Sequence, residues 1–289
     1  MNKFGAHDPR AVGAQIRMQI PNLTPLEAQV LDTMTSRTDF AETTGLKEVA
    51  VSAGVSEAMI VKIVKKVGFS GFREFRLALT TYNNSDTAGL YSEISPDDTS
   101  REIVEKVFRT AKQALEETLA ILDITGFDRA ASILHSARHR DFYGIGGSAQ
   151  IARDAAHKFL RIGLRASVHD DAHMMLMSAS VLGPEDCVLA FSHSGTTRAV
   201  LEPLEIARDK GARTIAITNY VDSPISSLVD VVLCSTAQGS PLLGENAAAR
   251  IAQLSILDAL FVVIAQQDAD VYETNLSKTM NAVGSKRAT

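Results

Sequence analysis

The stretch from Val188 to Arg198 constrains the fold of this chain more than any other. Residues 188–191 are all apolar, which suits a strand that helices cover on both faces, and a helical pattern begins near Arg198. The turn between them is rich in hydroxyls and holds one glycine, as Ser192, His193, Ser194, Gly195, Thr196 and Thr197. Because a helix N-terminus presents unpaired N–H groups, this turn predicts a phosphate site. The alternative is that these residues only cap the helix.

A second turn of similar kind runs from Tyr143 to Ser148, follows a short apolar run and opens another helical pattern. Its glycines suggest a dinucleotide fingerprint, but Ala149 stands where the third glycine belongs, so the pattern is weak. Asp170 and Asp171 are the acidic residues at a suitable distance for a ribose contact. The account that uses both turns has Ser148 and the 192–197 turn converge on one phosphate.

The chain from residue 140 onward alternates short apolar runs with helical patterns. The expected strands are residues 141–145, 165–168, 187–191, 214–217 and 231–234. This alternation predicts a doubly wound parallel α/β sheet. Ligands of such sheets lie beyond the carboxyl ends of the strands, where both polar turns fall.

The N-terminal part predicts a helix-turn-helix. Thr24 and Glu27 form a capping box with Pro25 at the first helical position, so one helix begins there. A second helix covers residues 46–53 and ends at Gly54. A third helix is capped by Ser56 and ends at Gly68. The alternative is a plain helical hairpin that packs on the rest of the chain.

The third helix has a core stripe of Ile60, Ile63, Val64 and Val67 and an opposite polar side. We expect that polar side to enter the major groove of double-stranded DNA. The DNA-contacting residues expected are Ser56, Glu57, Ala58, Met59, Lys62, Lys65 and Lys66. Residues 1–82 hold ten Lys or Arg against eight Asp or Glu, so they are positive although the whole chain has a net charge of −5.

Three segments organise the chain. Residues 1–82 form the all-α DNA-binding domain, residues 83–97 a polar linker, and residues 98–289 the α/β domain. Residues 103–122 keep apolar side chains at an i, i+4 spacing, which predicts a long helix at the start of the second domain. That helix serves as a subunit contact or packs on its own sheet, and the sequence leaves both open.

Composition excludes several classes of protein. We find no apolar run that reaches the roughly 18 residues needed to span a bilayer, and the N-terminus lacks the apolar core of a signal peptide. The expected location is therefore the cytoplasm, with no membrane partner. Cys187 and Cys234 lie at apolar strand positions, which suits buried free thiols. We expect no cofactor and no metal.

Two sets of motifs resemble a known family. Residues 53–62 with residues 68–76 resemble the N-terminal domain of RpiR-type bacterial transcription regulators. Residues 56–62 with residues 241–250 are most similar to the ribose-phosphate isomerase regulator subgroup. The two polar turns resemble the GxGxS and SxSGxT loops of the sugar isomerase (SIS) domain, a flavodoxin-like fold that binds phosphosugars. The resemblance covers residues 20–268.

The resemblance implies a function and a ligand site. It implies a transcriptional regulator whose operator binding is controlled by a sugar phosphate, as a homodimer or homotetramer and not as an enzyme. The ligand residues expected are Gly146, Gly147, Ser148, Ser192, His193, Ser194, Gly195, Thr197 and Glu245. The alternative is an aldose–ketose isomerase, whose catalytic glutamate would lie within the helix near Ala248, where the chain instead has Arg250, Gln253 and Ser255. An RNA-binding protein finds little support, because Phe72 and Phe75 suit a helix core better than a stacking platform.

Overall fold

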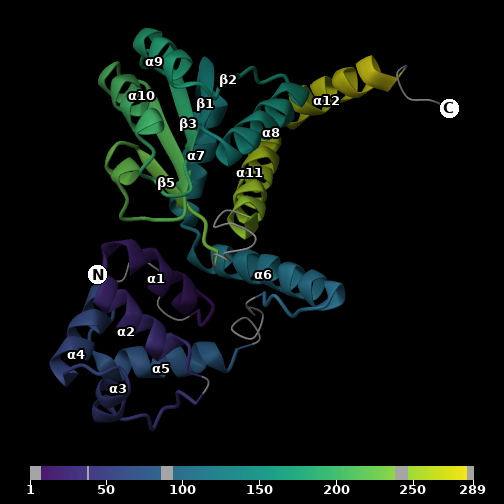
Figure 1. Cartoon of the computed structure of the whole chain (residues 1–289). Coiled ribbons are helices and arrows are strands. Elements are labelled where there is room, and N and C mark those ends of the chain that lie inside the picture. The colour runs from purple at the N-terminus through teal and green to yellow at the C-terminus, as the bar shows by residue number, and fades with distance from the viewer. Residues whose placement is uncertain (1–7, 38, 86–93, 238–246, 285–289) are drawn as a thin grey trace. The chain divides into compact units, whose positions relative to one another are not determined.

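The computed structural model describes residues 8–37, 39–85, 94–237 and 247–284 (Figure 1). The chain divides into two compact units. The first contains residues 1–121 and 236–248, and the second contains residues 122–235 and 249–289. Each unit has its own buried apolar core.

The first unit is helical. Its elements are α1 (Ala11–Gln19), η1 (Ile20–Asn22), α2 (Pro25–Thr35), α3 (Leu46–Ser52), α4 (Glu57–Lys66), α5 (Phe72–Asn83) and α6 (Ser100–Ile121). Thr24 Oγ1 accepts from the Glu27 N–H, and the Glu27 carboxylate accepts from the Thr24 N–H, so the expected capping box is confirmed. The sequence did not predict α1.

The expected helix-turn-helix is confirmed in α3 and α4. Gly54 ends the turn after α3 at φ 66°, and Ser56 Oγ caps α4 by accepting from the Met59 N–H at 3.2 Å. The stripe Ile60, Ile63, Val64 and Val67 is fully buried in the core of this unit. Phe72 and Phe75 lie in the same core and pack edge to face against Phe40, so they are not a stacking platform.

Helix α6 is amphipathic in an unusual sense, because its polar side is the buried one. Its buried residues include Thr110, Gln113, Glu117 and Thr118. Tyr82 from α5 donates to Glu117 Oε1 at 2.8 Å, Gln113 donates to the same oxygen at 2.9 Å, and Arg17 from α1 forms an ion pair with Oε2. The Glu117 carboxylate therefore joins three helices inside the first unit.

Helix α6 thus belongs to the helical unit, whereas residues 98–121 were expected at the start of the α/β domain. The described residues show α6 packed against α1, and Thr118 Oγ1 receives the Thr236 N–H at 3.0 Å within the same unit. The sequence missed this arrangement because the residues that dock α6 are polar, and a hydrophobic pattern reports only apolar contacts.

The second unit is the expected parallel sheet. Its strands are β1 (His139–Gly144), β2 (Ser167–His169), β3 (Asp186–Phe191), β4 (Arg213–Thr218) and β5 (Val231–Cys234), in the order β2-β1-β3-β4-β5. All neighbouring pairs are parallel. This is the doubly wound order of flavodoxin-like folds, and strand order reverses at β1 and β3.

Helices cover both faces of this sheet (Figure 1). One face packs against α7 (Ile124–Ser136), α8 (Gly147–Arg161) and α11 (Ala247–Gln267), and the other against α9 (Ala172–Val181) and α10 (Arg198–Asp209). The remaining elements are η3 (Pro224–Ser227) and α12 (Ala269–Gly284). Cys187 and Cys234 are free and buried as expected, and burial raises the pKa of each thiol to about 12.

One described helix, α11, is long and apolar enough to cross a membrane by length and composition. The expectation that no such stretch exists was therefore wrong. Ile256, Leu257, Leu260 and Ile264 of this helix are buried in the core of the second unit. A core helix of a globular unit passes the same test of length and hydropathy, so α11 is weak evidence for a membrane span.

Replacement of Glu117 by alanine should destabilise the first unit. The substitution leaves the Arg17 charge in a largely buried place without its carboxylate, which typically costs about 3 kcal/mol or more. Urea unfolding followed by circular dichroism measures the change. The matched control is Glu116→Ala, because Glu116 is a partly exposed neighbour that pairs with Arg10 and should contribute less than about 1 kcal/mol. Equal losses in the two variants would contradict the central role of Glu117.

Candidate functional site

The two polar turns leave the sheet side by side. Strands β1 and β3 are neighbours, and their register pairs Gly144 with Phe191, the last residue of each strand. Neighbouring strands lie about 4.8 Å apart, so the turns that follow begin at the same level of the carboxyl edge. The edge at which β1 and β3 end is also the point where strand order reverses, which is the usual ligand position of such sheets.

The first turn brings the N-terminus of α8 to this edge. Gly146 has φ 59°, and α8 begins at Gly147 with Ser148 half-buried in its first turn. The chain passes so close to itself that a Cβ on Gly144 would lie 2.7 Å from the Ser148 carbonyl oxygen. Only glycine fits there, and the tight turn is closed by the N–H groups of Ser148 and Ala149, which donate to the Ile145 and Gly146 carbonyls at 3.2 Å.

The second turn holds a buried hydroxyl without a partner. Ser192 is 3% exposed, and among the described residues its Oγ has no hydrogen-bond partner. Its backbone N–H donates to the Ile217 carbonyl at 3.1 Å, so the backbone is fixed while the side chain is free to bind. An unsatisfied buried hydroxyl costs about 1 to 3 kcal/mol, which makes Ser192 a candidate ligand contact.

The side chain of the residue that precedes α10 does not cap this helix. Thr197 is the N-cap of α10, yet its side chain makes no capping hydrogen bond. Ser194 Oγ instead accepts from the N–H and the hydroxyl of Thr196, at 3.2 and 2.8 Å. The hydroxyls of this turn are therefore not consumed by the helix that follows.

Gly195 fixes the shape of the second turn. Its φ is 65°, and a Cβ there would lie 2.1 Å from Ser223 Oγ, so any other residue would displace the segment before η3. The Gly195 carbonyl accepts from the Ile225 N–H at 3.0 Å. The neighbouring His193 is held by its carbonyl, which accepts from the Asn219 N–H at 3.0 Å, and its ring stacks edge to face on Tyr220.

Arg250 is a residue of this region that sequence reasoning passed over. It lies in the first turn of α11 and is exposed, and a Cβ on Gly147 would lie 3.5 Å from its Nη1. A guanidinium thus stands beside the N-terminus of α8, where an anion would gain from both. The signal available in the sequence was a basic residue in the first turn after the last strand. Glu245, the other expected residue here, lies outside the described residues.

The acidic residues of the dinucleotide alternative have other partners. Asp170 forms an ion pair with Arg153, and Asp171 caps α9 by accepting from the Met174 N–H at 3.0 Å. Gln253 likewise serves the fold, because its amide donates to Ser235 Oγ at 3.3 Å while 1% of it is exposed. These side chains therefore have structural roles in the described chain.

The residues expected at DNA lie on one side of α4. Ser56, Glu57, Ala58, Lys62, Lys65 and Lys66 are exposed, and Met59 is half-buried against the core. Lys62 Nζ lies 3.0 Å from Glu27 Oε1, and Lys66 Nζ lies 2.6 Å from Glu27 Oε2. A buried carboxylate of α2 therefore pairs with two of the lysines expected at DNA.

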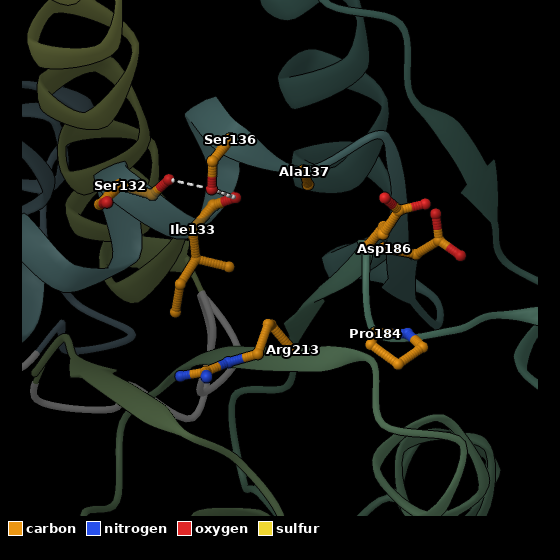
Figure 2. Close-up of a pocket in the computed structure, with 8 residues that line it drawn as sticks. Ser132, Ile133, Ser136, Ala137, Pro184, Asp186 and Arg213 are labelled. Carbon is orange, nitrogen blue, oxygen red and sulfur yellow. Dashed lines mark hydrogen bonds between the residues drawn. The ribbon is translucent and has the colours of Figure 1, made fainter.

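A surface hollow lies at the other end of the sheet and is a different feature. Figure 2 shows its lining, which comes from the end of α7 and the starts of β3 and β4. The lining residues are Ser132, Ile133, Ser136, Ala137, Pro184, Glu185, Asp186 and Arg213. The amino ends of parallel strands are not where such sheets bind ligands, and Arg138 and Gly183 already hold the Asp186 carboxylate.

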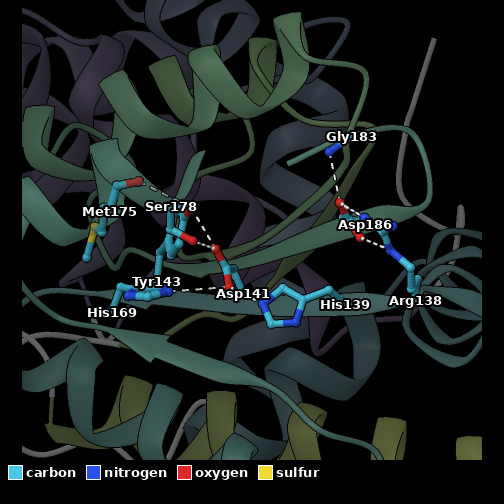
Figure 3. Close-up of polar contacts among 9 residues, drawn as sticks. All are labelled: Arg138, His139, Asp141, Tyr143, His169, Met175, Ser178, Gly183 and Asp186. Atoms are coloured by element: carbon cyan, nitrogen blue, oxygen red, sulfur yellow. Dashed lines mark hydrogen bonds and ion pairs between the residues drawn. The ribbon is translucent and has the colours of Figure 1, made fainter. Parts of the chain in front are cut away.

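A buried carboxylate ties β1 to β2 and α9. Figure 3 shows Asp141 with His139 and His169, whose Nε2 atoms lie 2.9 and 3.3 Å from Oδ1, and with the hydroxyls of Tyr143 and Ser178 at Oδ2. Burial alone would raise the pKa of Asp141, but the hydrogen bonds from His169 and Ser178 outweigh it, so the pKa is lowered. His169 thus has a structural role in the described chain, because it contacts a buried carboxylate of the neighbouring strand.

Two family models match separate parts of the chain. The rpiR-family helix-turn-helix domain matches residues 11–86, and the SIS domain matches residues 133–263. The class defined by fold and site is therefore a transcriptional regulator with a DNA-binding domain and a SIS domain, and not an enzyme.

Similar proteins show which family this is. The chain is 41% identical to the HTH-type transcriptional regulator RpiR of Escherichia coli K12 over 280 residues, which cover 96% of this chain and 95% of that protein. It is 32% identical to an uncharacterized HTH-type transcriptional regulator of Haemophilus influenzae, over 92% and 94% of the two chains. The chain belongs to the RpiR family of transcriptional regulators.

Solved structures share the fold. The Vibrio vulnificus NanR protein in complex with ManNAc-6P is 24% identical with a TM-score of 0.62, over 96% of this chain and all of that one. The sugar isomerase domain of an RpiR transcription factor from Sphaerobacter thermophilus is 21% identical with a TM-score of 0.57, over 61% and 97% of the two chains. The fold expected from the sequence motifs is thus confirmed in both units.

The Asp141 cluster predicts a dependence of stability on pH. Because the folded pKa lies below the ordinary value of 3.8, ionised Asp141 stabilises the fold above that pH, and the contribution is lost as pH falls below it. Asp141→Asn should lower the free energy of unfolding at neutral pH, and the gap to the unmodified protein should narrow below pH 3.8. Urea titrations across this range measure it, with exposed Asp128→Asn as control. A gap that stays constant with pH would contradict the assignment.

Proposed function

We propose that this regulator binds a sugar phosphate at the carboxyl edge of its sheet and a double-stranded DNA operator through α4, and that the first binding event controls the second. The observation that carries the proposal is the buried hydroxyl of Ser192, in the turn between β3 and α10, which has no hydrogen-bond partner among the described residues. The ManNAc-6P in the structure of the Vibrio vulnificus NanR protein supports the ligand class. The proposed location is the cytoplasm, because the relatives of this chain are transcriptional regulators.

The phosphate is the part of the ligand that this edge suits best. A doubly charged phosphate accepts several hydrogen bonds, and this edge offers hydroxyls, the partial positive charge at the N-terminal ends of α8 and α10, and the Arg250 guanidinium. The proposed contacts are Gly146, Gly147, Ser148, Ser192, His193, Ser194, Gly195, Thr197, Glu245 and Arg250. The isomerase alternative is not favoured, because the chain belongs to a family of regulators.

Ser192→Ala tests the ligand site. The change removes a hydrogen bond to a charged group, so affinity for a sugar phosphate should fall about tenfold to a hundredfold. Thermal stability without ligand should not fall, because the hydroxyl has no hydrogen bond to lose among the described residues. Calorimetric titration with ManNAc-6P and with inorganic phosphate measures affinity.

The control for that experiment is Ser180→Ala. Ser180 is an exposed serine of α9 whose Oγ donates to a carbonyl of its own helix, so the change should leave affinity unchanged. Unchanged affinity in Ser192→Ala, or a loss of equal size in both variants, would reject the proposed contact. The contact would also be rejected if DNA binding by Ser192→Ala responded to the ligand with the same midpoint concentration as the unmodified protein.

We propose that the regulator acts as a symmetric dimer joined through α6. The helix buries its polar side and exposes an apolar stripe, Val104, Phe108, Leu115 and Leu119, at 56, 73, 37 and 62%. The stripe is symmetric about its centre, since residues 104 and 119 and residues 108 and 115 are equally far from it. Two copies packed antiparallel would each bury the stripe of the other, and a two-fold dimer suits a two-fold operator.

Phe108→Glu should convert the dimer to monomers. A charge at the most exposed apolar position of the stripe would be buried without a partner at the interface. Sedimentation equilibrium measures the mass, with Leu77→Glu on α5 as control, because Leu77 is an exposed apolar residue outside the stripe. A monomeric unmodified protein, or a dimeric Phe108→Glu variant, would refute the proposed interface.

A further inference from the structure

Glu27 lies on α2, outside the expected recognition surface, yet it contacts two lysines of α4. Its carboxylate is divided between them, with Oε1 at 3.0 Å from Lys62 Nζ and Oε2 at 2.6 Å from Lys66 Nζ. The Lys62 side chain is 61% exposed and that of Lys66 is 37% exposed, whereas Glu27 is 2% exposed. A buried anion therefore anchors two cations whose other sides face solvent.

The carboxylate itself is held in place. Oε2 also accepts from the Thr24 N–H at 3.0 Å, as the second half of the capping box that starts α2. The hydrogen bond from Lys66, then that from the Thr24 backbone, then that from Lys62 lower the pKa of Glu27 to about 2, so it is ionised at neutral pH. The position of both lysines on α4 thus depends on the start of α2.

The lysines need this anion for an electrostatic reason. Lys62 and Lys66 are one turn apart on the same face of α4, and like charges at i, i+4 repel each other. The shared carboxylate offsets that repulsion and still leaves each ammonium with N–H groups to donate, because an ammonium has three. Lys65, which lies between them in sequence, has no ion pair among the described contacts of α4.

We infer that Glu27 is a positioning residue for DNA recognition, which fixes the ammonium groups of Lys62 and Lys66 and thereby raises the preference for operator over other DNA. The inference rests on the proposed DNA surface of α4. Lysine side chains that are not held in place can contact the phosphates of DNA of any sequence, and such contacts do not depend on base sequence. Groups held at fixed points serve only a duplex whose phosphates or base edges fit them.

The test compares Glu27→Gln with the unmodified protein on two duplexes. One is of random sequence, and the other is selected from a random pool by the unmodified protein. Glutamine can keep the capping box but removes the charge. Affinity for the random duplex should rise about tenfold and its salt dependence should steepen by about one to two units, since two cations are released. Affinity for the selected duplex should rise less, so the ratio of the two should fall.

Further variants separate the possible outcomes. On the selected duplex, Lys62→Gln with Lys66→Gln should make the salt dependence shallower by about two units, and adding Glu27→Gln to that pair should change nothing more. Glu27→Asp keeps the negative charge on a side chain that is one methylene shorter. It should lower the ratio of affinities for the selected and random duplexes by a smaller factor than Glu27→Gln does. Melting curves from circular dichroism show that each variant is folded.

Two results overturn different statements. In one result, Glu27→Gln and Glu27→Asp change neither the salt dependence nor the ratio of affinities for the two duplexes, while the salt dependence of the double lysine variant becomes shallower. This result would overturn the positioning role of Glu27 and leave it only as part of a helix cap. A double lysine variant with unchanged salt dependence would instead overturn the proposed DNA surface of α4.

Discussion

The register between β1 and β3 is the constraint on which the proposed ligand site depends. Because Gly144 and Phe191 are paired at the last position of both strands, two turns far apart in sequence start from one edge. Each turn can then be short and rigid. In the second turn Gly195 makes this possible, because a side chain at this position would collide with Ser223. A shift of one residue in this pairing would reverse the inward and outward faces of a strand and separate the hydroxyls.

Two carboxylates have a comparable role in the helical unit. Glu27 joins α2 to α4, and Glu117 joins α6 to α1 and α5. Each is almost completely buried and receives more than one donor, which is the condition under which a buried charge stabilises a particular arrangement of helices rather than disrupting it. The orientation of the helix-turn-helix and the direction in which α6 faces are therefore set by polar contacts, on a core that is otherwise apolar.

The sequence was sufficient for the elements that repeat a simple pattern. All five strands, the capping box at Thr24 and the cap at Ser56 follow from local residue types, and they fall within a few residues of the predicted places. The inward face of α6 did not follow, because Glu117 is acceptable inside only when Arg17 and Tyr82 arrive from distant parts of the chain. Arg250 was not predicted as a ligand contact for the same reason: its charge is visible in the sequence, but its position beside Gly147 is a property of the fold.

The hydrogen bonds between Thr118 and Thr236 have a consequence for how the chain matures. Their two residues are 118 positions apart, and both belong to the helical unit. A ribosome adds about 5 to 20 residues per second. Thr236, whose backbone hydrogen-bonds to the Thr118 hydroxyl, is therefore synthesised roughly 6 to 24 s after Thr118. The nascent helical unit therefore stays unfinished until all five strands of the sheet have been translated.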